Sequence, residues 1–206
     1  MRRLLLWLSL TALGAAPAGG EPKADAPKTA VAVFAGGCFW CMEPPFDALD
    51  GVLSTTSGYT GGPVENPSYE QVSQGGTGHF EAVRVEYDPA RVSYPQLLEV
   101  FWQNVDPLDG GGQFCDRGSQ YASAIFVADS EQRRLAAASK QALEQSKRFE
   151  QPIATRILAA GAFYAAEDYH QDYARRNPLR YRFYRSGCGR DARLKTVWGS
   201  SNAHQP

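Results

Sequence analysis

The sequence has few cysteines and almost no net charge. Its 206 residues include 4 cysteines, and 21 lysines and arginines face 22 aspartates and glutamates, for a net charge of −1. A balanced charge gives no electrostatic footprint for nucleic acid, so we expect no nucleic-acid partner. A domain of this size does not need disulfide bonds among only four cysteines to be stable. A four-cysteine zinc site does not fit either, because Cys115 and Cys188 each lack a second cysteine nearby in the sequence. Redox chemistry is therefore the leading interpretation of the cysteines.

The apolar run at the N-terminus, Leu4–Leu13, is too short for a comfortable transmembrane helix. Two arginines precede it, and Ala16 and Ala18 are small residues at the positions that a signal peptidase recognises before its cleavage site. We expect a signal peptide over 1–18, a linker over 19–29, a catalytic domain over 30–199 and a disordered tail over 200–206. The protein is then periplasmic or secreted, with no stable membrane insertion after cleavage, or membrane-tethered if the signal stays uncleaved.

No repeat of solenoid length is visible, and a hydrophobic content of 43% is enough for one well-buried core. Strand-like apolar runs alternate with helix-like segments, which predicts a single α/β layered domain. The predicted strands are 31–35, 52–59, 79–87, 119–128 and 154–160, and the predicted helices are 46–49, 94–105, 130–148 and 165–176. Loops 60–78 and 106–118 are rich in Gly, Pro and Asn, so we expect binding residues there.

A cysteine follows the first predicted strand at a glycine turn, where residues 36–41 read Gly-Gly-Cys-Phe-Trp-Cys. Glycines allow a sharp turn, and the N–H groups of a helix starting nearby would stabilise a thiolate on Cys38. Phe39 and Trp40 are suited to line a slot for a small apolar group. Because Pro44-Pro45 fits the first turn of a helix, we expect the regular helix to begin a few residues past Cys38, which weakens its dipole there.

A carboxylate lies on an apolar strand face. In residues 79–87, Glu81 shares its face with Val83 and Val85. Desolvation on such a face favours the protonated form, which suits a general acid near neutral pH. Pairing with an arginine on an open sheet face explains this strand equally well.

Glu167, His170 and Tyr173 recur at three-residue spacing, so a helix would place them on one face as a hydrogen-bonding patch. We do not expect His170 to act as a base on this spacing alone. Cys188 lies between two glycines near the end of the domain. A mobile thiol at this position can reach a distant sulfur.

Four segments match one enzyme family in combination. They read Gly-Cys-Phe-Trp at 37–40, Gly-His-Phe-Glu-Ala-Val at 78–83, Asp-Arg-Gly-Ser-Gln-Tyr at 116–121 and Glu-Asp-Tyr-His-Gln-Asp-Tyr at 167–173. Over about residues 30–199 the chain resembles the A-type peptide methionine sulfoxide reductases, which restore methionine from its sulfoxide. The resemblance implies an α+β fold, a two-layer α/β sandwich with a mixed sheet of ferredoxin-like type, without metal or organic cofactor. It also implies selection of the S epimer of methionine sulfoxide, protein-bound or free.

The resemblance implies a role for each matching residue. Cys38 is similar to the nucleophile that attacks the sulfoxide sulfur, and Glu81 to the acid. Phe39 and Trp40 resemble the slot for the S-methyl group. The residues that resemble the hydroxyls on the sulfoxide oxygen, or the polar shell around them, are Tyr69, Tyr121, Asp116, His170 and Tyr173. An acid and neutral donors suit the reaction, since a sulfoxide oxygen leaves only when protonated.

The sulfenic acid left on Cys38 needs a second thiol, which forms a disulfide that an external thioredoxin-type donor reduces. Cys41 competes for this role through a Cys-x-x-Cys disulfide, although many family members carry glycine there. Cys188 resembles the C-terminal recycling cysteine of the family and is favoured, while Cys115 is interpreted as a packing residue. The expected partners of this monomer are oxidised methionine-containing proteins and peptides and the thioredoxin-like donor.

Three other hypotheses stay open. A thioredoxin-like dithiol oxidoreductase would use Cys38 and Cys41 and need neither Glu81 nor Cys188. An acyl hydrolase would pair Cys38 with His170. A non-enzymatic exported module would be held by Cys38–Cys41 and Cys115–Cys188 disulfides.

Overall fold

The computed structural model describes residues 29–199 and contains a mixed sheet, a small β-ribbon and several helices. The strands are β1 Ala30–Gly36, β2 Val52–Thr60, β3 Phe80–Tyr87, β4 Gly112–Gln113, β5 Asp116–Arg117, β6 Ser123–Val127, β7 Arg156–Ala159 and β8 Phe163–Ala165. The helices are α1 Phe39–Asp47, α2 Tyr69–Ser73, α3 Tyr94–Gln103, α4 Ser130–Gln145, α5 Tyr173–Arg176, α6 Pro178–Gly187 and α7 Arg190–Trp198, with 3₁₀ turns η1 Ser119–Tyr121 and η2 Asp168–His170.

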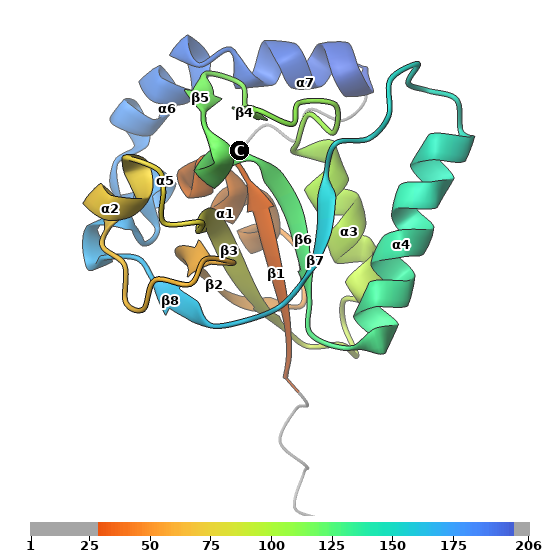
Figure 1. The fold of residues 1–206 in the computed structure, drawn as a ribbon, viewed down its shortest axis with the longest axis horizontal. Helices are drawn as coiled ribbons and strands as arrows, with labels where there is room; N and C mark the ends of the chain where they lie inside the picture. Colours follow the sequence, from red (N-terminus) through yellow and green to blue (C-terminus); the bar gives the residue numbers. More distant parts are fainter. Residues whose placement is uncertain (1–28, 200–206) are drawn as a thin grey trace, which may run out of the picture.

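The six-stranded sheet has the order β7-β6-β1-β3-β2-β8 (Figure 1). The β6–β7 pair is parallel and the other neighbouring pairs are antiparallel, so the sheet is mixed. The strands β4 and β5 form a separate two-stranded ribbon. In Figure 1, α6 and α7 run along the upper edge of the molecule, beside β4 and β5 and above the end of β1. This edge is where the chain leaves β1 for the Cys38 turn.

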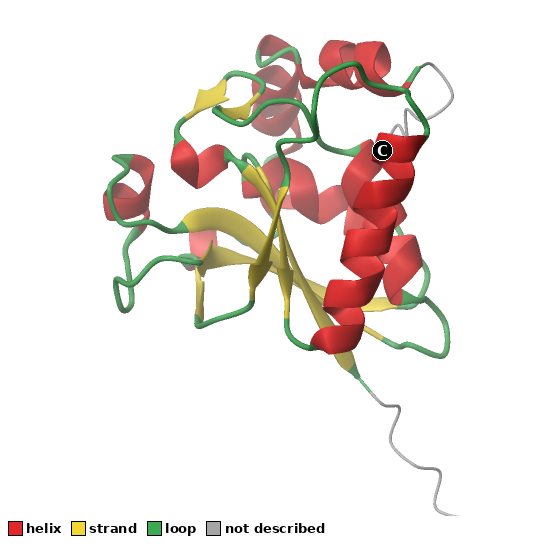
Figure 2. Cartoon of the chain, turned by 45° about the vertical axis from the view of Figure 1, so that its right-hand side comes forward, coloured by secondary structure: helices red, strands yellow, loops and turns green. Residues whose placement is uncertain are grey.

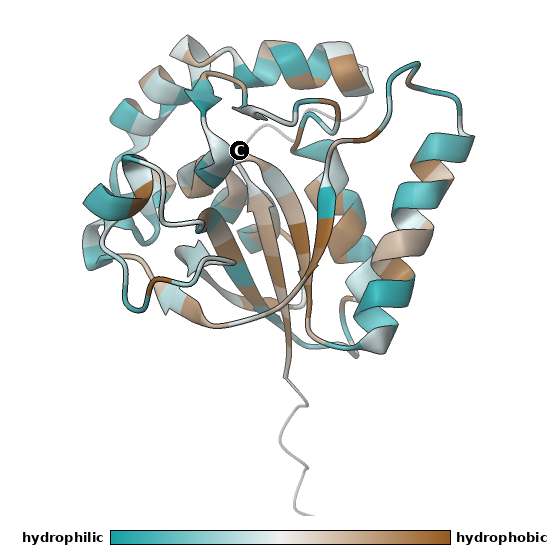
Figure 3. Ribbon diagram, viewed as in Figure 1, coloured by the Kyte–Doolittle hydropathy of each residue, from teal (hydrophilic) through white to brown (hydrophobic). Residues whose placement is uncertain are grey.

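The main core lies between one face of the sheet and helices α1, α3 and α4 (Figure 2). Phe34 of β1 points into it and stacks on Phe46 and Phe101, with ring centroids 5.1 and 5.2 Å apart. Burial of each such ring stabilises the fold by about 1.5–3 kcal/mol. A smaller cluster on the opposite face includes Phe80 and Phe126. Figure 3 shows this distribution, with the hydrophobic colour concentrated on the strands and the hydrophilic colour on the outer helices.

Most of the predicted elements are confirmed. The strands predicted at 31–35, 52–59, 79–87 and 154–160 correspond to β1, β2, β3 and β7, and the helices at 94–105 and 130–148 to α3 and α4. The run predicted as one strand at 119–128 begins as the turn η1 and becomes a strand only in β6. The two-layer α+β sandwich with a mixed sheet is confirmed, while its ferredoxin-like character stays an expectation.

The predicted late start of the helix after Cys38 is wrong. Helix α1 begins at Phe39, with Cys38 as its N-cap residue, and carries Pro44 and Pro45 in its interior. The prolines remove two backbone donors from the second turn of α1. Burial of Phe39 and Phe46 against the sheet stabilises the helix despite this loss, because packing supplies most helical stability in proteins.

The single helix predicted at 165–176 is also wrong. Ala165 ends β8, residues 168–170 form η2, and a separate helix α5 begins at Tyr173. Asp172 adopts a left-handed conformation with φ of 53°, which interrupts any continuous helix. Pairing of Ala165 with Gly58 of β2 removes the first turn of the predicted helix.

Some predictions concern residues outside the described part of the chain. The signal peptide at 1–18, almost all of the linker at 19–29 and the tail at 200–206 lie there. Within residues 29–199, the structure contains no helix of the length and apolarity that a membrane crossing requires.

Candidate active site

Cys38 lines a small cavity at the point where β1 meets α1. The cavity has a volume of about 70 Å³, and its walls come from β3, β5, α2, α6, η1 and the first turn of α1. Its lining residues are Cys38, Phe39, Trp40, Tyr69, Glu81, Asp116, Tyr121 and Tyr184. The tertiary structure therefore brings together seven residues that were predicted from the sequence and one, Tyr184, that was not.

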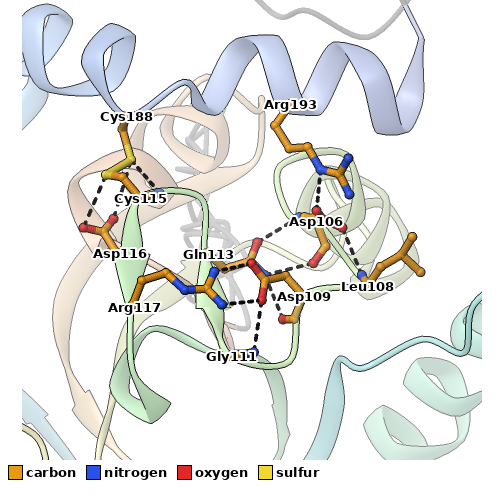
Figure 4. Close-up of polar contacts among 10 residues, drawn as sticks. All are labelled: Asp106, Leu108, Asp109, Gly111, Gln113, Cys115, Asp116, Arg117, Cys188 and Arg193. Atoms are coloured by element: carbon orange, nitrogen blue, oxygen red, sulfur yellow. Dashed lines mark hydrogen bonds and ion pairs between the residues drawn. A yellow bond between two sulfur atoms is a disulfide. The ribbon is translucent and has the colours of Figure 1, made fainter.

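The turn before Cys38 requires glycine at one position. Gly37 has φ of +81°, and a Cβ there would lie 2.6 Å from Cβ of Gln113. Gln113 is itself fixed, since its side chain accepts a hydrogen bond from Asp106 N–H and donates one to Asp106 C=O, both at 2.8 Å (Figure 4). The turn that carries Cys38 thus packs against an ordered loop, and a larger residue at position 37 would displace it.

Glu81 faces the cavity as a buried carboxyl group that is 2% exposed. Its Oε2 accepts a hydrogen bond from the backbone N–H of Phe39 at 3.2 Å, so the first turn of α1 orients it. Burial raises the pKa of Glu81 to about 8, although the Phe39 N–H opposes this shift. The alternative of an arginine partner is wrong, since the ion pairs within residues 29–199 do not include Glu81.

Cys38 and Cys41 are buried free thiols that hydrogen-bond to one another. Burial raises the pKa of Cys38 well above its ordinary value, an effect that a hydrogen bond with Tyr184 opposes. The expected resting thiolate on Cys38 is therefore wrong, because desolvation outweighs the helix N-terminus. The hydrogen bond from Cys38 lowers the pKa of Cys41 to about 6 despite burial.

Arg190 is a buried cation beside this pair that the sequence analysis did not single out. It is 1% exposed, and its Nη2 donates to the carbonyl oxygens of Gly36 at 3.0 Å and Asn104 at 2.7 Å. Its charge helps to lower the pKa of Cys41. One arginine in a helix forms no motif, and its only sequence signal is its position two residues after Cys188.

Trp40 is held from behind by His170 and Tyr173. The indole Nε1 donates to Nδ1 of His170 at 3.0 Å, and the indole ring stacks on Tyr173 with centroids 3.7 Å apart. Burial lowers the pKa of His170, which keeps the ring neutral and able to accept this bond. Neither His170 nor Tyr173 lines the cavity, so both position Trp40. An acyl hydrolase would need a hydrogen bond between His170 and Cys38. In the described residues, the His170 side chain instead bonds to Trp40.

Tyr69, Tyr121 and Tyr184 bring phenol groups to the cavity. Burial raises the pKa of each above its ordinary value, so all three stay protonated and can donate hydrogen bonds. The Tyr184 hydroxyl donates to Oδ2 of Asp116, whose pKa burial also raises. Tyr184 lies one helical turn before Cys188, and this spacing is the signal that would have found it.

Glu167 belongs to the predicted polar patch and acts at a distance from the cavity. Its carboxylate accepts hydrogen bonds from the backbone N–H of Tyr69 and the hydroxyl of Tyr59, both at 2.8 Å. Glu167 thereby fixes the start of α2, from which the Tyr69 ring reaches the cavity.

Cys115 and Cys188 form a disulfide, with their Cα atoms 4.9 Å apart (Figure 4). The interpretation of Cys115 as a packing residue is therefore wrong, since Cys115 is exposed and covalently bonded. Sγ of Cys188 lies 4.0 Å from Oδ2 of Asp116, which connects the disulfide to the cavity wall. Cys115, Asp116 and Cys188 could in principle hold a metal ion, but sulfurs joined in a disulfide offer no thiolate ligand.

Comparison with known proteins agrees with this arrangement. A family model described as peptide methionine sulfoxide reductase matches residues 30–202. The chain is 53% identical to peptide methionine sulfoxide reductase MsrA 2 of Caulobacter vibrioides, over 97% of this chain and 100% of that protein. It is also 53% identical to MsrA of Bacillus licheniformis, over 87% of this chain and 99% of that protein.

Solved structures give the same result. The reduced form of Mxr1 from Saccharomyces cerevisiae matches with a TM-score of 0.69 and 30% identity, covering 76% of this chain and 90% of Mxr1. Methionine sulfoxide reductase A of Corynebacterium diphtheriae matches with a TM-score of 0.66 and 34% identity, covering 75% and 78% of the two chains. The chain therefore belongs to the peptide methionine sulfoxide reductase family of oxidoreductases.

Proposed function

We propose that this enzyme reduces the S epimer of methionine sulfoxide at Cys38, in free methionine and in proteins. The observation that carries the proposal is the cavity itself, where a thiol, a protonated carboxyl group and neutral phenols face the same small space. Phe39 and Trp40 supply the apolar wall that fits an S-methyl group. The family of the chain supports the same reaction.

In the first step, the Cys38 sulfur attacks the sulfoxide sulfur after its proton passes to Cys41. Glu81 protonates the sulfoxide oxygen, and the tyrosine hydroxyls hold that oxygen while its charge develops. The net change is Cys38 thiol plus methionine sulfoxide to Cys38 sulfenic acid plus methionine. Two electrons pass from Cys38 to the substrate sulfur, and the oxygen leaves with Cys38.

Epimer selection follows from two fixed positions around a pyramidal sulfur. The aromatic wall of Phe39 and Trp40 holds the methyl group, and Glu81 with the tyrosines holds the oxygen. With attack from Cys38, the third substituent can point to the cavity mouth in only one epimer. We assign the S epimer from the family resemblance, and turnover of enantiopure sulfoxides tests it.

We propose that Cys41 closes on the sulfenic acid first. Its thiol already contacts Cys38, whereas Cys188 is bonded to Cys115. Condensation of the Cys41 thiol with the sulfenic acid gives a Cys38–Cys41 disulfide and water. Exchange with reduced Cys188 and Cys115 then restores both buried thiols and leaves the Cys115–Cys188 disulfide. These steps end with Cys38 and Cys41 as free thiols and with Cys115 and Cys188 joined, which is the arrangement in the structure.

The electron donor in this proposal is a thioredoxin-type dithiol protein, and no prosthetic group takes part. A disulfide whose Cys115 is exposed is accessible to such a donor. The yeast protein Mxr1 has been solved in complex with Trx2, which is a property of that protein and a precedent for the partner type.

Substitution of single cysteines tests these assignments. We expect Cys38→Ser to abolish methionine formation while the fold stays intact, and retained turnover would overturn the proposal. Cys188→Ser should still form about one methionine per enzyme but fail to cycle with thioredoxin. In Cys41→Ser, the sulfenic acid should persist on Cys38 and react with dimedone. A dimedone adduct in Cys188→Ser instead would make Cys188 the resolving thiol.

The competing dithiol oxidoreductase hypothesis has its own test. Such an enzyme would reduce a protein disulfide through Cys38 and Cys41 alone. We therefore expect the Glu81→Gln, Cys188→Ser double variant to be inactive toward insulin disulfides under conditions where thioredoxin reduces them. Activity of that variant would favour the competing function.

We also propose that the protein is exported and acts as a soluble monomer in the periplasm or outside the cell. The support is the residue pattern of the first 18 positions, with arginines, an apolar run and a small-residue cleavage site. Intact-mass analysis of the protein purified from the periplasm tests this. A mass that still includes the first 18 residues would contradict cleavage.

A further inference from the structure

A second cavity lies beside α1, separate from the one at Cys38. One of its walls is a face of α1, and the others come from α5 and α6, with α5 packed against both of these helices (Figure 1). The cavity has a volume of about 520 Å³, which is in the range of pockets that hold small molecules. No residue lines both this space and the catalytic cavity. We name it the α1 cavity.

Glu43 brings a buried carboxyl group to the α1 cavity. The residue is 2% exposed, and its Oε1 accepts a hydrogen bond from the Ser57 hydroxyl at 2.9 Å. Its Oε2 is buried as well but has no hydrogen-bond partner within residues 29–199. Leaving a buried polar atom unpaired costs free energy, and most such atoms in proteins are hydrogen-bonded. A ligand that carries a hydrogen-bond donor would satisfy this oxygen.

The carboxyl groups on this face of α1 have no cationic partner. Asp47 lies one turn after Glu43 and also lines the cavity, and the ion pairs within residues 29–199 include neither of them. Of the two arginines in the cavity wall, Arg175 pairs with Asp172 and Arg182 is exposed. Burial raises the pKa of Glu43 to about 7, and the charge of Asp47 adds to this shift. A cation bound beside Glu43 would favour its ionised form.

Much of the remaining wall is apolar. Pro44 and Ala48 are the neighbours of the two carboxyl residues on α1, and Pro178 and Tyr181 contribute from α6. Such a wall fits a hydrocarbon chain. A primary ammonium group on an aliphatic chain matches both features, because its N–H groups can donate to Oε2 of Glu43 and its charge is opposite to that of a carboxylate.

Two other cavities of similar size lack the unpaired acceptor. The groove that α3, α4 and Trp198 line has a volume of about 570 Å³, but its glutamate, Glu99, is exposed. The cavity beside β8 has a volume of about 510 Å³, and its Glu167 already accepts two hydrogen bonds. Within residues 29–199, neither cavity is lined by a residue with a buried unpaired side-chain atom. The α1 cavity therefore differs from them in its chemistry and not in its size.

We propose that the α1 cavity is a binding site for a free aliphatic primary amine in its protonated form. The ammonium group donates a hydrogen bond to Oε2 of Glu43, and Asp47 adds a second negative charge nearby. The hydrocarbon chain of the ligand lies against Pro178 and Tyr181. This site is additional to the reduction of methionine sulfoxide at Cys38 and does not depend on it.

Helix α5 connects the α1 cavity to the catalytic cavity. Asp172 and Ala174 line the α1 cavity, and Tyr173 between them stacks on Trp40 with ring centroids 3.7 Å apart. A bound amine would contact the residues on either side of Tyr173 without entering the space at Cys38. Binding is therefore best measured directly, because activity would also respond to any movement of Trp40.

An NMR titration of the full chain tests the proposal. Amide spectra of the ¹⁵N-labelled protein are recorded near neutral pH with increasing n-hexylamine, and in parallel with n-hexanol, its neutral analogue. We expect n-hexylamine to shift the backbone amides of Ala48, Ala174 and Arg175 in a saturable way, with a Kd of about 1 mM or lower. n-Hexanol should bind at least about 10-fold more weakly, since hydrogen bonds between charged groups are the stronger ones.

Two variants change the α1 cavity, and two matched controls change the groove between α3 and α4. Glu43→Gln keeps the size of the side chain and removes its charge, and it should weaken n-hexylamine binding by about 10-fold or more. Ala48→Phe fills the cavity from an exposed position and should abolish the saturable shifts, which keeps the proposal testable if Glu43→Gln does not fold. Glu99→Gln and Ala138→Phe make the same changes at exposed positions of the other groove and should bind as the wild type does.

Four results would overturn the proposal. The first is the absence of saturable shifts up to about 10 mM n-hexylamine. The second is an affinity that n-hexanol matches or that Glu43→Gln and Ala48→Phe leave unchanged, which would show that the α1 cavity does not recognise the ammonium group. The third is a set of shifts confined to α3 and α4. The fourth is tighter binding of a blocked Gly-Gly-Lys-Gly-Gly peptide than of n-hexylamine, which would assign the site to a lysine side chain of a protein.

Discussion

At Cys38, burial and the helix N-terminus act on the thiol in opposite directions. Removal from water raises the pKa of Cys38, and the hydrogen bond with Tyr184 only partly opposes this. Glu81 is neutral for the same reason, since burial raises its pKa to about 8. Before substrate binds, the Cys38 thiol and the Glu81 carboxyl group are therefore both protonated. The reaction needs the proton of Glu81 on the sulfoxide oxygen.

The pH dependence of the first step should report Glu81. As a general acid, Glu81 acts only when protonated, so the single-turnover rate should fall as pH rises past about 8. We expect Glu81→Gln to slow the step by roughly 10²–10⁴ and to remove this alkaline fall. Rapid-quench measurement of methionine between pH 6 and 10 checks both. A Glu81→Gln variant that keeps the wild-type rate or the alkaline fall would remove Glu81 from the role.

Glu81 should also reduce stability at neutral pH. Its pKa is about 8 in the fold against an ordinary value near 4.5, so the folded state holds a proton that the unfolded state has lost. As pH rises from about 4.5 to about 8, this carboxyl group therefore lowers the free energy of unfolding, and the full loss is reached above about pH 8. We expect Glu81→Gln to raise the melting temperature at pH 8 and to leave it unchanged at pH 4, as differential scanning calorimetry would show. A lower melting temperature at pH 8 would contradict this.

Tyr184 should contribute to the chemistry, although it forms part of no motif. Tyr184→Phe removes the hydroxyl that contacts Cys38 and Asp116. One such hydrogen bond to a charged group is worth about 1.5–3 kcal/mol, so we expect a rate at least 10-fold lower in a single turnover. Tyr94→Phe is the control, because it removes a buried hydroxyl in the main core. Equal rates for the two variants would show that Tyr184 has no part in the step.

At the scale of elements, Arg190 joins α7 to the end of β1. Its guanidinium donates hydrogen bonds to the carbonyl oxygens of Gly36 and Asn104. No other side chain within residues 29–199 donates a hydrogen bond to either oxygen. Arg190→Met should therefore lower the free energy of unfolding by about 2–4 kcal/mol, measured in urea. Loss of the charge should also raise the pKa of Cys41, which shifts the pH profile of its alkylation upward. We expect Arg190→Lys to fall between Arg190→Met and the wild type, and a wild-type profile in Arg190→Met would contradict the assigned role.

For the whole molecule, the Cys115–Cys188 disulfide closes a long stretch of chain. It joins residues 73 positions apart and ties the loop before β5 to the junction of α6 and α7. Crosslinks of this span stabilise a fold by about 2–4 kcal/mol, chiefly by restricting the unfolded chain. We expect dithiothreitol to lower the urea midpoint of unfolding of the wild type. The midpoint of the Cys115→Ser variant, which lacks the disulfide, should not change. An unchanged midpoint in the wild type would show that the bond acts in electron transfer without stabilising the fold.

Local patterns predicted much of the fold and the site. Strand-like apolar runs predicted β1 and β2, and in β3 the alternation of residues 79–87 also predicted which side chains share a face, because a strand turns successive side chains to opposite faces. The family resemblance supplied seven of the cavity residues. The errors at α1 and at 165–176 share one cause, since packing against the sheet and strand pairing outweighed the local preferences there.

The sequence by itself determined the residue types at Cys38 and Glu81, the glycine turn and the apolar faces of the strands, because these depend on near neighbours in the chain. Only the tertiary structure decided which groups meet. Tyr184 reaches the cavity from α6, Arg190 reaches the end of β1 from α7, and Cys115 bonds Cys188 across 73 positions. Contacts between distant segments, and the loss of water that sets the protonation of Cys38 and Glu81, exist only once the chain has folded.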